Sequence, residues 1–112
     1  MESDISHFEA EMNRGFLQIL VLVVLENAMY GYMMLKKFEQ MGYAVEENTL
    51  YPLLRRLEKK EYIKSEWDVS QGRPKKFYII TDKGKEIRKN VLKIWHEQHK
   101  IIDILLEANK NA

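Results

Sequence analysis

The sequence predicts a mainly helical α+β fold, in which three helices are followed by a β-hairpin and a long last helix. Two observations predict it. Apolar residues recur at helical spacing in four segments, whereas residues 62–81 alternate in polarity or are β-branched and aromatic. The chain has 112 residues, of which 46% are hydrophobic and 31% charged, so one folded domain with its own core is expected.

Composition and the first residues exclude several classes of protein. The absence of cysteine excludes disulfide frameworks, thiolate zinc sites and cysteine nucleophiles. The opening segment, MESDISHFEAEMN, is acidic and lacks the basic region of a signal peptide. The longest apolar run, Ile19 to Leu25, is far shorter than the ~20 residues that span a bilayer. We therefore expect a soluble, cytoplasmic protein without a membrane partner.

The first two helices carry much of the predicted core. A helix is expected from about Phe8 to Glu26, and its apolar segment FLQILVLVVL should be enclosed on several sides. A second helix is expected to end at about Met41, followed by Gly42 as its C′ residue. Its inward-facing residues should be Met34, Leu35, Phe38 and Met41.

A third helix is predicted between Glu46 and Glu61. It carries leucines at i, i+3, i+4 and i+7, namely Leu50, Leu53, Leu54 and Leu57, which form one apolar stripe. Proline inside a helix removes a hydrogen bond and clashes with the preceding turn. Either the helix starts near Asn48 or Thr49, which leaves Pro52 in its first turn, or it is kinked there.

A hairpin and a long helix complete the chain. Strands are predicted over Tyr62–Val69 and Lys76–Thr81, joined by a turn that contains Gly72 and Pro74. Thr81 is a good N-cap residue for a last helix that runs to about Ala108. Three helices followed by a two-stranded hairpin is the order of a winged helix-turn-helix.

Charge is unevenly distributed, although the formal net charge is only +1. Residues 1–47 carry three Lys/Arg and eight Asp/Glu, residues 48–76 carry eight and four, and residues 77–112 carry seven and five. The middle of the chain is therefore basic and the N-terminal part acidic. A local excess of positive charge predicts a polyanionic partner.

The basic residues of the middle segment lie at positions that suit double-stranded DNA. If the leucine stripe is buried, the opposite face of the third helix presents Asn48, Pro52, Arg55 and Lys59, flanked by Tyr51 and Arg56. Arginine reads guanine and asparagine reads adenine in the major groove. The hairpin tip adds Arg73, Lys75 and Lys76, which suit phosphates or the minor groove. The alternative is an ordinary solvated helix face and a charged turn.

The last helix carries two adjacent apolar stripes. One is a heptad seam with members such as Ile87, Ile94 and Ile101, and the other includes Leu92, Trp95 and Ile102. A helix that only capped its own domain would need one stripe, so the second predicts a homodimer; the alternative is a thick core within one chain. We accordingly expect a DNA-binding unit over residues 1–81, whose first helix also contacts the partner, and a dimerisation helix over residues 82–112.

The middle of the chain resembles the PadR family of bacterial transcriptional regulators. The resemblance rests on Gly31-Tyr32, TLYPLLRRLE at Thr49–Glu58, Ser65-Glu66-Trp67, Gly72-Arg73-Pro74, Phe77-Tyr78, Thr81 and Lys83-Gly84. It implies a winged helix-turn-helix that binds an operator. The short tail resembles that of the compact subgroup with a single C-terminal dimerisation helix, which includes multidrug-sensing repressors. Together with the charge pattern, the family resemblance gives the predicted DNA-binding residues: Asn48, Thr49, Tyr51, Pro52, Arg55, Arg56, Lys59, Arg73, Lys75 and Lys76.

The same resemblance implies an effector site on the last helix. In multidrug-sensing relatives a tryptophan on this helix stacks on flat aromatic compounds, which places Trp95, with His99 beside it, in such a site. The alternative is that Trp95 only fills the dimer interface.

Catalytic and metal-binding motifs are missing from the sequence. His96 and His99 are three residues apart, whereas the zinc-protease motif needs four, and no third ligand is evident. There is no G-x-S-x-G elbow and no glycine-rich phosphate loop. We expect no enzyme, metal or cofactor. The predicted function is a repressor that a small aromatic effector releases from DNA, and the alternative is a winged-helix module that binds proteins.

Overall fold

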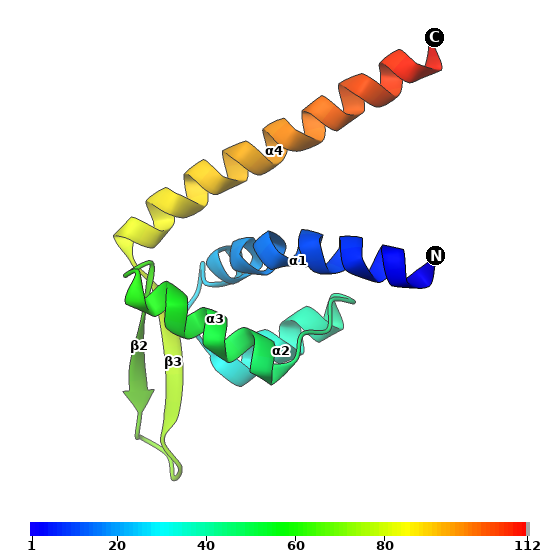
Figure 1. The fold of residues 1–112 in the computed structure, drawn as a ribbon. Helices are drawn as coiled ribbons and strands as arrows, with labels where there is room; N and C mark the ends of the chain where they lie inside the picture. Colours follow the sequence, from blue (N-terminus) through cyan, green and yellow to red (C-terminus); the bar gives the residue numbers. More distant parts are fainter. Residues whose placement is uncertain (112) are drawn as a thin grey trace.

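A computed structural model describes residues 1–111, and this part of the chain contains four helices and three strands (Figure 1). Ala112, the last residue of the predicted segment 82–112, lies outside the described residues. The mainly helical winged helix-turn-helix class is confirmed. In chain order the elements are α1 (Glu2–Val24), β1 (Met29–Tyr30), α2 (Gly31–Gln40), α3 (Glu47–Lys59), β2 (Ile63–Asp68), β3 (Lys75–Ile80) and α4 (Asp82–Lys110).

The sheet differs from the predicted two-stranded hairpin by one strand. β2 and β3 form the expected antiparallel pair, with Ile63 opposite Ile80 and Asp68 opposite Lys75. The short strand β1 joins the other edge of β3, so the order is β1-β3-β2. A strand of two residues is too short to show the alternation by which strands are recognised.

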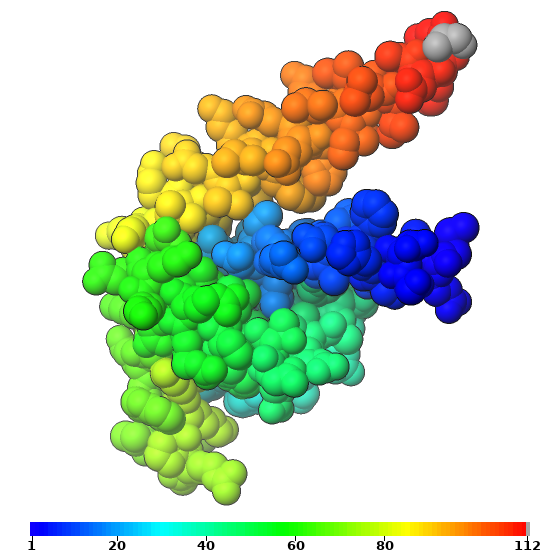
Figure 2. Space-filling model, in the orientation of Figure 1, coloured from blue at the N-terminus to red at the C-terminus, as the bar shows by residue number. Residues whose placement is uncertain are grey.

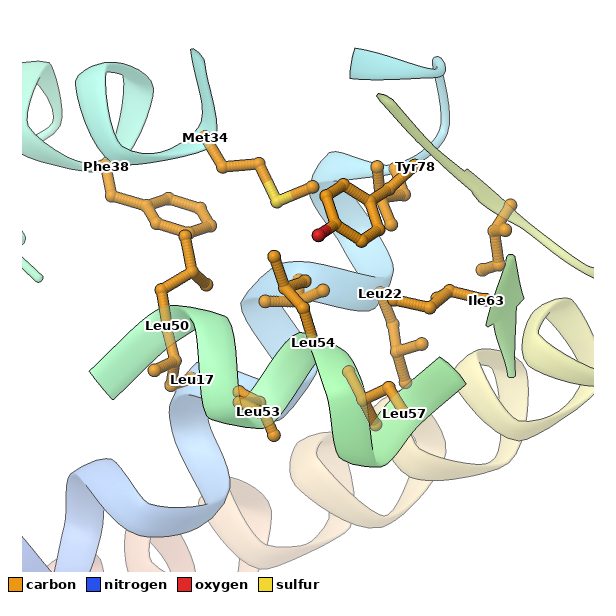
Figure 3. Close-up of a cluster of buried hydrophobic side chains, with 13 residues drawn as sticks. Leu17, Leu22, Met34, Phe38, Leu50, Leu53, Leu54, Leu57, Ile63 and Tyr78 are labelled. Atoms are coloured by element: carbon orange, nitrogen blue, oxygen red, sulfur yellow. The ribbon is translucent and has the colours of Figure 1, made fainter. Parts of the chain in front are cut away.

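The core lies between the first three helices and the sheet. The predicted leucine stripe of α3 is fully buried, and two of its members, Leu50 and Leu54, lie toward Phe38 and Met34 of α2 (Figure 3). α1 contributes Leu17, Val21 and Leu22 to the same cluster. Burying each of these side chains stabilises the fold by about 1.5–3 kcal/mol, which is why the third helix keeps its polar side outward.

Three details of the helices correct the prediction. α1 starts at Glu2 rather than near Phe8, and Phe8 is exposed. Met41 is 64% exposed rather than buried, because α2 ends at Gln40 and Met41 is its C-cap. α3 starts at Glu47, so Pro52 lies inside the helix and not in its first turn. Gly42 has a φ of +83°, as expected of a C′ glycine.

The last helix is fixed at its start and projects at its end. The Thr81 hydroxyl accepts a hydrogen bond from the Gly84 N–H at 3.0 Å, which confirms the predicted N-cap. The guanidinium of Arg88 pairs with the Glu26 carboxylate at 2.7 Å and so joins α4 to the chain just after α1. Beyond this point α4 and the N-terminal half of α1 extend from the same side of the molecule (Figure 2).

Candidate nucleic-acid interface

The outer face of α3 is polar and basic, as predicted. Asn48, Thr49, Arg55, Arg56 and Lys59 are exposed on this helix. Tyr51 and Pro52 are half-buried at its flank. The buried leucines fix the rotation of the helix about its axis, so these side chains face away from the core. One exposed helix face thus carries an amide, hydroxyls and three cations.

Tyr51 joins α3 to the start of α2. A Cβ added at Gly31 would lie 2.7 Å from Cε1 of the Tyr51 ring, so only glycine permits this contact. Burial, with a smaller contribution from Glu47, raises the pKa of Tyr51. A tyrosine hydroxyl is protonated at neutral pH, and burial favours that form further, so Tyr51 can donate a hydrogen bond.

A groove of about 390 Å³ separates α3 from the hairpin. Its wall combines aromatic rings with cations, an arrangement that suits a sugar-phosphate backbone. The residues that line it are Gly31, Tyr32, Tyr51, Arg55, Trp67, Lys75, Lys76 and Tyr78. Tyr32 and Trp67 were not among the residues predicted to bind DNA.

The three cations of the hairpin tip occupy different environments. Arg73 and Lys75 are exposed, and the Lys75 ammonium lies 5.8 Å from the ring centres of both Tyr30 and Tyr32. Lys76 is half-buried, and its Nζ lies 3.7 Å from Oε1 of Glu58 on α3. The predicted cations thus lie together on one hairpin, but only Lys76 is paired with α3.

A hydrogen-bonded carboxylate braces the base of the turn. Asp68 accepts from the Tyr30 hydroxyl at 2.5 Å, and from the Ser70 N–H at 3.0 Å and hydroxyl at 2.5 Å. The Ser70 hydroxyl, the Tyr30 hydroxyl and the Ser70 N–H, in that order, lower the pKa of Asp68 from 3.8 to about 2. Since Tyr30 lies on β1, the strand that the prediction missed holds the hairpin.

The predicted effector residues lie on α4, apart from this surface. Trp95 is half-buried, and its ring centre lies 4.0 Å from that of His99. Nδ1 of His99 lies 2.8 Å from the Trp95 carbonyl oxygen. The two side chains are therefore together, as expected from their spacing of one helical turn. Within residues 1–111 no three His, Cys, Asp or Glu side chains are grouped so that they could hold a metal ion.

Comparison with known proteins identifies the family. Residues 19–90 match the model of the transcriptional regulator PadR-like family. The chain belongs to the PadR-like family of transcriptional regulators. PadR-like regulators are DNA-binding transcription factors rather than enzymes, so this chain is a DNA-binding regulator.

Solved PadR-family structures share the architecture. A PadR family regulator from Eggerthella lenta is 39% identical with a TM-score of 0.86, and the match covers 95% of each chain. A PadR-like regulator from Bacillus cereus is 31% identical with a TM-score of 0.77, over 86% of this chain and 96% of its own.

Sequence comparison also finds an uncharacterised protein of Lysinibacillus sphaericus. It is 36% identical over 104 residues, which cover 88% of this chain and 95% of that protein. Among residues 1–111, none of the helices is long and apolar enough to cross a membrane.

Proposed function

We propose that this PadR-like protein is a cytoplasmic, sequence-specific repressor that binds an operator as a homodimer and is released by a small aromatic effector. The observation that carries the proposal is the exposed polar face of α3 beside a cationic hairpin. A module that binds proteins through the same helix would present apolar residues there. This face instead presents Asn48, Arg55 and Lys59.

Each predicted DNA-binding residue has a role that its position supports. Asn48 and Arg55 are assigned to base edges in the major groove, because amide and guanidinium groups form bidentate bonds there. Exposed cations and hydroxyl donors are assigned to the DNA phosphates. Pro52 is assigned an apolar contact. The phosphate-binding residues are Thr49, Tyr51, Arg56, Lys59, Arg73 and Lys75; Lys76 is treated below.

Exposed apolar residues on two helices support the homodimer. Ile94 and Ile101 of α4 are 53% and 58% exposed, and Ile5 and Phe8 of α1 are exposed as well. An isolated chain rarely leaves so large an apolar surface in water. A twofold dimer would place two α3 helices on successive major-groove turns, ~34 Å apart.

Repression and its release follow from this arrangement. A dimer bound across an operator excludes other proteins from that stretch of DNA. Trp95 lies on the helix assigned to dimerisation, and a planar ligand that stacks there would act on the spacing of the two α3 helices. The resemblance of Trp95 to the tryptophan of multidrug-sensing relatives supports an aromatic effector.

The test is selection of bound sequences from a pool of randomised duplexes by the purified protein. We expect a pseudo-palindromic site, and a slope of log K against log salt of roughly −7 if about eight phosphates are contacted. Arg55→Ala should relax specificity at one position in each half-site, at a cost of about 1–3 kcal/mol per lost base contact. Arg73→Ala should instead weaken all sequences alike and make the slope shallower.

The matched control is Lys36→Ala, which removes an exposed cation from α2 rather than from α3 or the hairpin tip. Lys36→Ala should relax specificity less than Arg55→Ala does, and it should change the salt slope less than Arg73→Ala does. Selection that enriches no sequence would contradict sequence-specific binding. Equal weakening of operator and random DNA by Arg55→Ala would contradict the assignment of α3.

A further inference from the structure

Glu58, the last residue of the TLYPLLRRLE motif, occupies an electrostatically unfavourable position on α3. It lies one residue before the end of the helix, where the helix dipole disfavours negative charge. It also lies beside the surface proposed to bind a polyanion, where a carboxylate weakens the attraction. Both effects are unfavourable, so the contacts of Glu58 must explain its place.

The Glu58 carboxylate contacts both long strands of the sheet. The Ser65 hydroxyl on β2 donates to Oε2 at 2.6 Å, and Nζ of Lys76 on β3 lies 3.7 Å from Oε1. The side chains of Glu58 and Lys76 are each 33% exposed. One carboxylate at the end of α3 thereby holds the two strands of the hairpin.

Two aromatic rings flank the Lys76 ammonium that pairs with Glu58. Nζ of Lys76 lies 5.9 Å from the Trp67 ring centre and 5.7 Å from the Tyr78 ring centre. Trp67 is opposite Lys76 in the sheet, and Ser65 is opposite Tyr78, so all four project from the sheet face that meets α3. We call Glu58, Ser65, Trp67 and Lys76 the Glu58 cluster.

We infer that Glu58 is a positioning residue, which fixes the hairpin relative to α3 so that both elements engage the same duplex. Lys76 then acts on DNA through the Glu58 cluster rather than as a phosphate ligand. The inference rests on the proposed function, because the relative placement of α3 and the hairpin matters for affinity only if both bind DNA.

Glu58→Gln tests the inference by the sign of its effect. The amide can still accept from Ser65 but cannot pair with Lys76. A carboxylate that acted only as a nearby negative charge would, when removed, let all DNA bind more tightly. If Glu58 is a positioning residue, operator affinity should fall roughly two- to tenfold, as expected for the loss of one partly exposed ion pair. Affinity for a random duplex should not fall.

Glu66→Gln is the matched control. Glu66 is an exposed carboxylate on β2, the strand that carries Ser65 and Trp67. Its side chain alternates with theirs and so projects from the face of the sheet opposite the Glu58 cluster. This variant should bind the operator at least as tightly as wild type. Urea unfolding of each variant shows that the compared proteins are folded.

Salt dependence of the Lys76 variants gives a second, independent measurement. Lys76→Gln should weaken operator binding without changing the salt slope, whereas loss of one phosphate contact in each protomer of the dimer would reduce the slope by about 1.8. Lys76→Arg should restore most of the affinity. The Glu58→Gln/Lys76→Gln double variant should be no weaker than Lys76→Gln alone, because both substitutions break the same pair.

The inference is overturned if Glu58→Gln binds the operator as tightly as wild type or more tightly, or if Lys76→Gln has the shallower slope. Failure of the proposed function gives a different result: the wild-type protein itself selects no operator. The probes are the duplex selected by wild type and a random duplex of equal length.

Discussion

Single side chains decide how the hairpin is held, and Asp68 shows it most clearly. Its carboxylate accepts hydrogen bonds from Tyr30 and Ser70 and has a pKa of about 2. A pKa that folding lowers means that the folded state binds the proton less readily than the unfolded chain. The stabilisation is therefore complete above the unfolded value near 3.8 and is lost as the pH falls through about 2.

Tyr30→Phe should weaken the pH-dependent stabilisation by Asp68, because it removes one of the hydrogen-bond donors to that carboxylate and raises its pKa. Wild type should be the more stable protein above pH 4, and the difference should shrink as the pH falls from about 4 towards 2. Urea unfolding at a series of pH values measures it. Tyr32→Phe, which removes a neighbouring hydroxyl, is the control. A difference that does not depend on pH would show that the hydrogen bond to Asp68 is not its cause.

Elements meet most closely where α4 begins. A Cβ added at Gly84 would lie 2.0 Å from the Tyr62 carbonyl oxygen and 2.8 Å from a side-chain carbon of Ile80. The carbonyl belongs to backbone that leads into β2, so it cannot move aside as a flexible side chain would. The first turn of α4 is thus pressed against the start of the hairpin.

Gly84→Ala should therefore lower the free energy of unfolding by about 1–3 kcal/mol, the usual cost of overpacking a tight site. Gly15→Ala is the matched control, because nothing lies within 4 Å of a Cβ built at that helical position. The control should stabilise α1 by about 0.5–1 kcal/mol through higher helix propensity. Denaturant unfolding compares the two, and equal stability of Gly84→Ala and wild type would contradict the close contact.

The elements also show what the sequence could and could not predict. The stripe of Leu50, Leu53, Leu54 and Leu57 has the helical period, so it predicted both the buried side of α3 and its exposed polar face. β1 has only two residues, and its pairing with β3 depends on the folded chain rather than on local pattern.

Within the candidate site, residue types were predictable but their pairing was not. The exposure of Arg55 and Arg73 followed from helix rotation and turn chemistry. The engagement of Lys76 by Glu58 depends on the strand register and on how the sheet packs against α3. Neither is encoded in a short stretch of sequence, so Lys76 was grouped with cations that are exposed.

At the scale of the whole molecule, the projecting helices predict an obligate dimer. Replacing Ile94 and Ile101 with Glu places two charges on the exposed seam of α4, outside the core. The double variant should be monomeric by light scattering, while wild type has twice the mass of one chain. Lys100→Glu, which reverses an exposed charge on α4 outside both apolar stripes, should stay dimeric. A wild-type protein with the mass of one chain at micromolar concentration would contradict the proposal.

The proposed effector site makes a separate prediction for the assembled protein. Planar aromatic dyes should quench the fluorescence of Trp95 in a saturable way, with a cation–π contribution of ~0.5–2 kcal/mol for cationic dyes. Trp95→Phe leaves Trp67 as the remaining indole, so the saturable signal should disappear while the dimer persists. An unchanged signal in Trp95→Phe would place the response elsewhere, and no response in wild type would leave Trp95 as an interface side chain alone.

A mechanical consequence follows from how α4 joins the sheet. β3 ends at Ile80 and α4 begins at Asp82, so a single residue, Thr81, separates them. The helix has 29 residues and is therefore about 44 Å long. A tilt of about 5° at Thr81 moves its far end by about 4 Å over that length. A large displacement of the far end of α4 therefore corresponds to only a small rotation of the helix where it joins the hairpin, next to the DNA-binding surface.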